Sequence, residues 1–385
     1  MKNVAILGST GSIGTQALSV IEKNLDRFSV YALSANSNIS LLHQQIKRFH
    51  PEKVVLMQEE KASELKRLLN GSRVKILIGD EGLKEVSTDR KIDIILIALT
   101  GIKGLESVIN SIDSGIRVAL ANKESLVAGG RFVMDVLKKR KGEILPVDSE
   151  HSAIFQLLSK ERRDAISKLI LTATGGPFRG KSKREMRNAR VEDVLRHPRW
   201  KMGKKVSIDS ATMVNKAFEM IEAHFLFGFN SEDIRVVVHP QAIVHSLIQM
   251  RDGSYLAHIG PTDMRIPIGY ALSYPERLEN ILSSALLSEM GDITFEKLRK
   301  PFDRPVEISR EIIEEDPDRG IVFNAADEIA VESFLSGIIR FGDIINIIEY
   351  SLKHIKPFSI KTVVDVLNFD MDIKRFLRGY INKRL

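Results

Sequence analysis

The sequence predicts an α/β protein that begins with a Rossmann-like, doubly wound parallel sheet. Short apolar runs recur through the first 150 residues, and amphipathic stretches of helical spacing separate most of them. Continuous apolar strands that alternate with helices are typical of a parallel sheet covered on both faces. A glycine-rich turn directly after the first run is a further sign of this fold.

The expected strands of this sheet are rich in valine, isoleucine and leucine; they cover residues 4–7, 29–33, 53–57, 74–78, 92–99, 116–121 and 143–147. Helical spacing is clearest over residues 15–25 and 126–140. Together these elements predict a first domain of residues 1–147.

After Asp148 the pattern becomes α+β, and we expect a second domain over residues 148–275. Its expected elements are helices over 151–160 and 206–227 and strands over 168–174, 234–238, 242–250 and 254–259. A basic, irregular stretch from 180 to 205 lies among them, and a long irregular segment inside a domain is usually a functional loop. We therefore expect a lid at about 197–205.

The rest of the chain is mostly helical. Tyr274-Pro275 leads into an expected linker, residues 276–294. Amphipathic stretches over 325–335 and 344–354 predict a helical C-terminal domain of residues 295–385.

The composition excludes several classes of protein. Of the 385 residues, 43% are hydrophobic and 28% are charged, which excludes a disordered or fibrous chain. The lack of cysteine excludes disulfides and zinc–thiolate sites and fits a reducing cytoplasm. No apolar run approaches the roughly 20 residues of a membrane span, and we expect the N-terminus to be a buried strand rather than a signal peptide. The net charge of +7 is spread along the chain, which favours small anionic substrates over nucleic acid.

Gly8, Gly11 and Gly14 form a G-x-x-G-x-x-G turn between the first expected strand and the first expected helix. Glycines allow close approach of a diphosphate, and the N–H groups and dipole of the helix N-terminus favour its charge. A plain βα turn without a ligand is the alternative, but the placement between strand and helix favours a dinucleotide.

The loop after the second strand bears on the type of dinucleotide. An NAD-binding site usually has an acidic residue there, which binds the ribose hydroxyls. This loop contains Asn36, Ser37 and Asn38 and no carboxylate, so the sequence favours NADP.

Asp148 and Glu150 follow an expected strand at its carboxyl end, where ligands bind in open α/β sheets. If the backbone stays extended, the two carboxylates point to one side and favour a hard divalent metal such as Mg²⁺ or Mn²⁺. The equally weighted alternative is a helix N-terminus, with Asp148 or Ser149 as its cap.

A second group of polar residues lies in the segment 210–219. On a helix, Asn215 and Lys216 share a face with Glu219, and Ser210 is close in sequence. Serine, amide and ammonium groups suit a phosphate monoester, and Glu219 suits a metal. From the pattern alone, an exposed helix face with an ordinary ion pair is the more frequent explanation. His197, His239, His245 and His258 receive no role by pattern.

Seven blocks of the chain together resemble one family; they are GSTGSIG, LANKESL, PVDSEHSAIFQ, LTATGGPF, HPRWKMGKKVSIDSATMVNKAFEMIEAH, HPQAIVHS and NAADE. The family is that of the 1-deoxy-D-xylulose 5-phosphate reductoisomerases, NADPH-dependent enzymes of non-mevalonate isoprenoid synthesis. The resemblance covers nearly the whole chain. It implies a homodimer of V-shaped subunits, each with an NADPH domain, a catalytic and dimerisation domain with a flexible lid, and a helical C-terminal domain.

The resemblance also implies roles for individual residues. The implied metal ligands are Asp148, Glu150 and Glu219, for Mg²⁺, Mn²⁺ or else Co²⁺, and these three with Lys123 are the implied catalytic residues. The implied substrate contacts are Lys123, Ser149, Glu150, Thr174, His197, Trp200, Ser210, Asn215, Lys216 and Glu219. The implied NADPH contacts are Thr10, Gly11, Ser12, Ile13, Asn36, Asn38, Asn122, Glu124 and Gly203. Trp200 and Met202 fall in the lid.

Two positions depart from the family's pattern. Thr174 stands where the family usually has serine before Gly-Gly, so the hydroxyl is kept beside an added methyl group. Ser37 stands beside Asn38 where the family often has lysine, which weakens the expected preference for NADPH.

The implied reaction breaks the C3–C4 bond of the ketose, rejoins the carbons as a branched aldehyde, and reduces that aldehyde with NADPH to 2-C-methyl-D-erythritol 4-phosphate. Two alternatives remain. A metal-independent NADP dehydrogenase would stay active with a chelator and leave the carbon skeleton intact. A non-enzymatic module that binds nucleic acid through the basic lid would bind with a steep dependence on salt.

Overall fold

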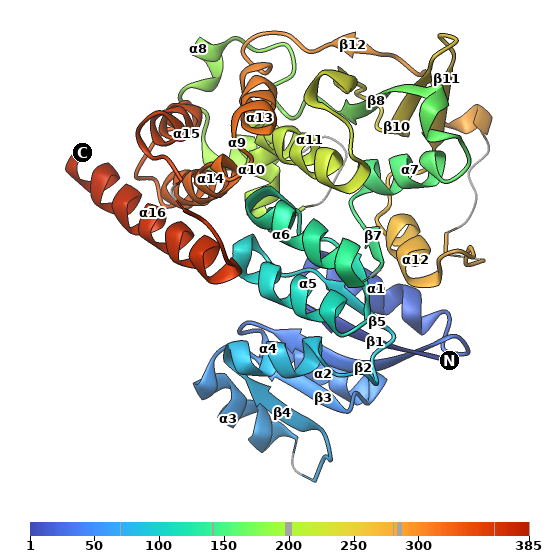
Figure 1. Ribbon diagram of the computed structural model, residues 1–385. Helices are drawn as coiled ribbons and strands as arrows, with labels where there is room; N and C mark the ends of the chain where they lie inside the picture. Colours follow the sequence, from blue (N-terminus) through green and yellow to red (C-terminus); the bar gives the residue numbers. More distant parts are fainter. Residues whose placement is uncertain are drawn as a thin grey trace. The chain divides into compact units, whose positions relative to one another are not determined.

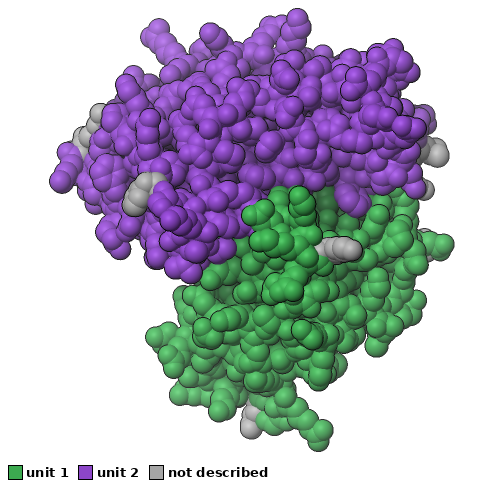
Figure 2. All heavy atoms as spheres, viewed as in Figure 1, with its two compact units in different colours: residues 1–122, 133–152, 263–284 green, residues 123–132, 153–262, 285–385 purple. Residues whose placement is uncertain are grey.

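The computed structural model describes residues 1–69, 71–140, 142–196, 202–279, 281–282, 287–357 and 359–384. The chain forms two compact units, which Figure 2 draws in different colours. Unit 1 comprises residues 1–122, 133–152 and 263–284, and unit 2 comprises residues 123–132, 153–262 and 285–385. The three-domain division expected from the sequence stays a prediction. Within the described ranges, no helix has the length and apolar character needed to cross a membrane.

Unit 1 is built on a seven-stranded parallel sheet with the strand order β4-β3-β2-β1-β5-β6-β7 (Figure 1). Its strands are β1 (Lys2–Leu7), β2 (Phe28–Ala35), β3 (Lys53–Leu56), β4 (Lys75–Ile78), β5 (Ile94–Ile97), β6 (Arg117–Leu120) and β7 (Ile144–Pro146). All seven predicted strands and the Rossmann-like fold are confirmed. The strand order reverses between β1 and β5, and this reversal places the ligand crevice of such sheets beyond the carboxyl ends of these two strands.

The helices between these strands are α1 (Ser12–Glu22), α2 (Ile39–Phe49), α3 (Glu59–Leu68), α4 (Gly79–Ser87), α5 (Gly104–Asp113) and α6 (Glu124–Arg140), of which α6 belongs to unit 1 only from residue 133. A distant segment adds α12 (Arg265–Ser273). This helix packs against α1, β6 and β7, and it buries Ile268 and Leu272. Unit 1 is therefore completed by residues that lie far beyond β7 in the sequence.

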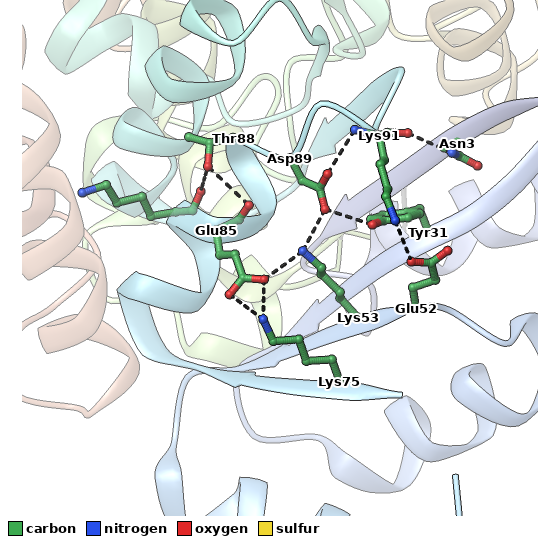
Figure 3. Close-up of polar contacts among 10 residues, drawn as sticks. Asn3, Tyr31, Glu52, Lys53, Lys75, Glu85, Thr88, Asp89 and Lys91 are labelled. Atoms are coloured by element: carbon green, nitrogen blue, oxygen red, sulfur yellow. Dashed lines mark hydrogen bonds and ion pairs between the residues drawn. The ribbon is translucent and has the colours of Figure 1, made fainter. Parts of the chain in front are cut away.

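A network of ion pairs ties α4 to the edge of this sheet (Figure 3). The ammonium group of Lys53 in β3 donates hydrogen bonds to Glu85 and Asp89, each at 2.8 Å, and Lys75 in β4 donates to Glu85 at 2.8 Å. The hydroxyl of Tyr31 in β2 donates to Asp89 at 2.9 Å. Burial, followed by the nearby Asp89, raises the pKa of Tyr31 far above its usual value, so this hydroxyl remains a donor.

Unit 2 contains a mixed five-stranded sheet with the order β11-β10-β8-β9-β12. Its strands are β8 (Ile166–Ala173), β9 (Ile234–Val238), β10 (Val244–Met250), β11 (Tyr255–Ile259) and β12 (Glu296–Lys297). Strand β8 runs parallel to β9 and antiparallel to β10. Leu169 and Leu171 of β8 share a buried apolar cluster with Met220 and Val306 from the helices of this unit. The predicted α+β character of this part is confirmed.

The helices of unit 2 are α8 (Lys183–Met186), α9 (Val191–Val194), α10 (Lys204–Thr212), α11 (Val214–Phe227), α13 (Arg304–Glu315), α14 (Arg319–Leu335), α15 (Asp343–His354) and α16 (Val363–Arg384), together with α7 (Ser149–Leu158) from residue 153. Helix α11 packs on α13, and α14 packs on α15 and α16. The helical C-terminal part expected from the sequence is thereby confirmed. In the described part of the irregular stretch 180–205 lie the short helices α8 and α9 and the first residues of α10.

The single helix predicted over 206–227 is wrong, because α10 and α11 meet at Met213. This residue has a φ of 68°, in the left-handed region, and it caps both helices. The carbonyl of Met213 accepts from the N–H groups of Lys216 and Ala217, each at 3.1 Å. Methionine is not a helix-breaking residue, and Met213 is buried like its apolar neighbours. The helical pattern of the sequence therefore continues across this position without a sign of the break.

Candidate active site

The glycine turn joins β1 to α1 at the carboxyl edge of the parallel sheet. Gly8 has a φ of +90°, and a Cβ atom there would lie 2.5 Å from the Ala98 carbonyl oxygen just beyond β5. A Cβ atom at Gly14 would lie 2.4 Å from the Gly8 oxygen. Both positions therefore need glycine, and the turn stands at the strand-order reversal where a dinucleotide diphosphate binds in this fold.

The start of α1 is suited to an anion. Gly11 is its N-cap, and within the described residues no side chain caps the helix and its first turn carries no acid. Its first N–H groups and the positive end of its dipole are thus available to a phosphate. Of the predicted cofactor contacts here, Gly11 and Ser12 are exposed, and Thr10 and Ile13 are half-buried.

The loop after β2 carries the other predicted contacts of the first part of the chain. Asn36 and Ser37 are exposed, and the exposed Asn38 caps α2 by accepting from the Leu41 N–H at 3.1 Å. The sequence missed a buried support under the glycine turn, where Gln45 accepts from the Ser9 hydroxyl at 2.7 Å. A lone glutamine in an amphipathic helix carries no signal of such a role.

Asn122 lies just after β6, at the same edge of the sheet, and is fully buried. Its amide donates to the carbonyl oxygens of Leu99 and Gly101, at 2.9 and 2.8 Å. It therefore fixes the loop after β5 beside the glycine turn.

Asp148 and Glu150 follow β7 at this edge, but the backbone between them is not extended. Helix α7 begins at Ser149, and the Asp148 carboxylate accepts from the Glu150 N–H at 3.2 Å, as an N-cap does. Of the two alternatives the helix N-terminus is therefore the correct one, since a free N–H group of the helix start binds the aspartate locally. The two carboxylates nevertheless keep oxygens within 4.8 Å of one another. Asp148 also lies 3.2 Å from a ring nitrogen of the buried His151, a neighbour that the sequence did not single out.

Glu219 in α11 lies at the centre of a cluster of cationic and amide groups. The Lys123 ammonium donates to Asn215 at 2.9 Å and to Glu219 at 3.2 Å. The Asn215 amide and the Lys216 ammonium also donate to Glu219. The side chains of Lys216 and Glu219 are only 4% and 1% exposed. The alternative of an ordinary exposed helix face is therefore excluded.

The left-handed break at Met213 places Asn215 and Lys216 in the first turn of α11, where helix N–H groups and dipole favour an anion. A second turn approaches the same place. Gly176 has a φ of +65°, and a Cβ atom there would lie 3.0 Å from the Ser210 carbonyl oxygen. The Thr174 hydroxyl accepts from the Gly176 N–H at 3.3 Å. The turn that contains Thr174 and Gly176 thus lies against Ser210 within unit 2.

The remaining predicted residues fall into two groups. His197 and Trp200 lie outside the described residues, so the lid is described only from Met202 onwards. Gly203 is the N-cap of α10, and the buried Glu124 lies in the first turn of α6. His239 is fully buried and accepts from two backbone N–H groups, which is a structural role.

Three family profiles match this chain. They are 1-deoxy-D-xylulose 5-phosphate reductoisomerase over residues 4–130, its C-terminal domain over residues 144–227, and a DXP reductoisomerase C-terminal domain over residues 259–376. The chain is 44% identical to the reductoisomerase of Lachnospira eligens, over 96% of this chain and 97% of that protein. It is 45% identical to that of a Thermoanaerobacter species, over 97% and 98%.

Solved structures agree with these sequence matches. A DOX-P reductoisomerase in complex with NADPH, fosmidomycin and magnesium matches with a TM-score of 0.94 and 36% identity, over 99% of this chain and 98% of that one. The enzyme from Zymomonas mobilis in complex with NADPH matches with a TM-score of 0.91 and 39% identity, over 99% of each chain. The profiles, the full-length relatives and the fold agree, and the chain belongs to the 1-deoxy-D-xylulose 5-phosphate reductoisomerase family.

Proposed function

We propose that this protein converts 1-deoxy-D-xylulose 5-phosphate into 2-C-methyl-D-erythritol 4-phosphate, using NADPH and a divalent metal ion. The observation that carries the proposal is the cluster that Lys123, just before α6, forms with Asn215, Lys216 and Glu219 of α11, in which Lys216 and Glu219 are buried. A buried ion pair such as Lys216 with Glu219 costs desolvation energy, and buried charged groups of this kind cluster at functional sites. Their residue types match the substrate contacts and the metal ligand expected for this family.

The phosphate of the substrate is assigned to the N-terminus of α11. Ser210, Asn215 and Lys216 supply a hydroxyl, an amide and an ammonium group there, and the Thr174 turn lies against Ser210. The phosphate takes no part in bond making. Its binding energy holds the reacting carbons in register and excludes water from them.

We assign the metal to Asp148, Glu150 and Glu219. Carboxylate oxygens are the ligands that Mg²⁺ and Mn²⁺ prefer, and the close approach of Asp148 and Glu150 favours a cation between them. When bound, such an ion supplies a Lewis acid that polarises a carbonyl and stabilises negative charge on its oxygen. Ser149 and Glu150 are assigned to the neighbouring hydroxyl groups of the substrate.

Lys123 has two tasks in this proposal. Its ammonium group holds Glu219 in place through a hydrogen bond of 3.2 Å, and the same group supplies positive charge beside a substrate oxygen.

For NADPH we assign the diphosphate to Thr10, Gly11, Ser12 and Ile13, and the 2′-phosphate to the loop of Asn36 and Asn38. Asn122, Glu124 and Gly203 are the remaining proposed contacts.

Product analysis by NMR tests the reaction. The enzyme is incubated with the deoxyxylulose phosphate, NADPH and Mg²⁺ or Mn²⁺, and the branched methylerythritol phosphate is expected. A chelator should stop turnover. Continued turnover with an unbranched product would support the metal-independent dehydrogenase, and binding of RNA or DNA with a steep salt dependence would support the nucleic-acid module.

Ser37→Asp tests the cofactor assignment. A carboxylate there should repel the 2′-phosphate and accept from a ribose hydroxyl, so the ratio of kcat/KM for NADPH to that for NADH should fall. Ser40→Asp, an exposed position one residue into α2, is the matched control. An unchanged ratio in Ser37→Asp would remove residue 37 from the ribose site.

We also propose a homodimer that forms through β11. This strand is an edge of the five-stranded sheet, and its Tyr255 and Ile259 are 54% and 41% exposed. These two residues lie on one face of the strand, since side chains alternate. An exposed apolar edge strand invites pairing with a second copy of the chain.

Light scattering tests the dimer. The wild-type protein should have twice the 43.3 kDa mass of one chain, and Tyr255→Lys/Ile259→Lys should lower the mass to that of one chain. Leu25→Lys, at a residue that is 54% exposed in unit 1, should leave the mass unchanged. A dimer that survives both lysines in β11 would place the interface elsewhere.

A cytoplasmic location, which the cysteine-free sequence favours, is testable by cell fractionation.

A further inference from the structure

Lys205, in the first turn of α10, lies among three carboxylates that the sequence did not connect. Its Nζ atom is 2.7 Å from Asp209, 2.8 Å from Asp327 and 3.6 Å from Glu124. Asp209 is one turn further along α10, Glu124 begins α6, and Asp327 comes from α14 of the C-terminal helical part. All four residues belong to unit 2.

The surroundings of Lys205 hold its ammonium group in place. It lies 4.5 Å from the ring centre of Phe218 in α11, which packs edge-on against Phe323 of α14 at 4.9 Å. Asp327 is fully buried and Asp209 nearly so. Burial raises the pKa of both aspartates, and their mutual repulsion raises it further for Asp209. Burial alone would lower the pKa of Lys205, but Asp209, Asp327 and Glu124 outweigh it and keep the lysine charged.

The three carboxylates do not hold the Lys205 ammonium group at equal distances. Asp209 and Asp327 hold the ammonium group close, whereas Glu124 lies about 0.8 Å further away. Glu124, and Gly203 two residues before Lys205, are both proposed NADPH contacts. If Asp327 lost its charge, Lys205 would be drawn toward Glu124, because a buried ammonium group turns to the nearest remaining carboxylates.

We propose that Asp327 is a positioning residue for NADPH binding, which holds Lys205 on α10 and thereby keeps it from closing on Glu124. The inference rests on the proposed cofactor contacts of Glu124 and Gly203. It gives the C-terminal helical part a task in cofactor binding, although none of its residues is assigned to touch the cofactor.

Asp327→Asn is the direct test, because asparagine has nearly the same shape and removes only the charge. The dissociation constant for NADPH, measured by calorimetry on the full-length protein, should rise about tenfold. The double variant Lys205→Met/Asp327→Asn should bring it back to within threefold of wild type, since no ammonium group then competes for Glu124. Such a rescue is a coupling that loss of stability alone does not produce.

Glu328→Gln is the matched control. Glu328 is the next residue of α14 and pairs with Lys374 of α16 at 2.6 Å, so it has a comparable ion pair that faces another helix. Its substitution should lower the melting temperature without changing NADPH affinity. Equal losses of affinity in Glu328→Gln and Asp327→Asn, unchanged affinity in Asp327→Asn, or further loss in the double variant would each overturn the inference.

Lys205→Met alone covers the case in which Asp327→Asn does not fold. Its methionine keeps the packing on Phe218, and NADPH should bind at least as tightly as to wild type. A tenfold loss of affinity in this variant would overturn the inference. Failure of the wild-type enzyme to bind NADPH would instead contradict the proposed function, so the two outcomes are distinguishable.

Discussion

The ammonium group of Lys123 lies 3.2 Å from the carboxylate of Glu219, although the two residues are 96 positions apart in the chain. This pair joins the start of α6 to the middle of α11 inside unit 2. Glu219 is also bound by Lys216, so two cations neutralise one buried carboxylate.

Glu219→Gln should lower kcat by roughly 10³-fold, or about 4 kcal/mol, because the site loses a charged metal ligand. Mg²⁺ should raise the melting temperature of the wild-type protein, since it binds only the folded state, and should raise that of the variant much less. Steady-state kinetics and thermal denaturation with and without Mg²⁺ provide the check. Glu307→Gln, at an exposed carboxylate of α13, should behave as wild type. Wild-type turnover in Glu219→Gln would exclude Glu219 as a ligand.

Two substitutions of Asp148 separate its capping role from its proposed role with the metal. Asp148→Asn keeps a good helix cap, so the free energy of unfolding should change little while turnover is largely lost. Asp148→Ala should lose turnover and in addition about 1 kcal/mol of stability. Urea denaturation and a turnover assay measure the two effects. If Asp148→Asn turned over at the wild-type rate, only the capping role would remain.

Gly176→Ala should raise the KM for the sugar phosphate by about tenfold. The new Cβ atom would meet the Ser210 carbonyl oxygen at 3.0 Å and push the Thr174 turn away from α10. Gly180→Ala is the matched control, because Gly180 also has a positive φ, +82°, but has nothing within 4 Å of an added Cβ. Both variants should be destabilised by roughly 1 kcal/mol through the left-handed backbone. Equal KM values would show that the contact with Ser210 does not shape the phosphate site.

Lys53→Met should make stability less dependent on pH at the acid end. Hydrogen bonds from Lys53 and Lys75 lower the pKa of Glu85, and Lys53 lowers that of Asp89 against the opposing effect of burial. A carboxyl group whose pKa is lowered by folding stabilises the protein above its unfolded pKa, near 4, and this stabilisation is lost as the pH falls through the folded pKa. The free energy of unfolding of the variant should be roughly 1–3 kcal/mol lower than that of the wild type at pH 7, and the difference should be smaller at pH 3.

Urea titrations at several pH values check this prediction. Lys91→Met is the control, because Lys91 is 69% exposed and its ion pair with Glu52 is long, at 3.8 Å (Figure 3). Lys91→Met should lower the free energy of unfolding by less than about 1 kcal/mol, and it should not change how that free energy depends on pH. A parallel loss at all pH values in Lys53→Met would indicate that packing of its stem matters more than its charge.

The sequence was sufficient for features that local patterns encode. Seven apolar runs predicted the seven parallel strands, because a strand buried on both faces must be apolar throughout. The glycine turn could be predicted because Gly8 and Gly14 have no space for a Cβ atom. The break at Met213 could not, since a left-handed methionine is imposed by tertiary packing rather than by residue type.

Other features depend on contacts between distant residues. Whether Lys216 and Glu219 are exposed could not be decided from their helix alone, because their burial depends on partners such as Lys123. Lys205 and Asp209 show helical i, i+4 spacing, so their contact could be predicted. The contact of Lys205 with Asp327, more than 100 residues later, could not be predicted from that spacing. The segment around Asp148 was compatible with a helix N-cap and with an extended backbone. Only the helix start at Ser149 in the structure distinguishes the two.

The packing of α12 on α1, β6 and β7 also sets an order of events during synthesis. The ribosome completes β7 at residue 146 and reaches α12 only at residue 265. At 5–20 residues per second, the nascent Rossmann-like sheet therefore waits roughly 6–24 s for the helix that covers part of it. During that interval the surface that receives α12 is open to water and to chaperones. A ribosome-bound chain halted before residue 265 should accordingly be more sensitive to protease than one halted after residue 320.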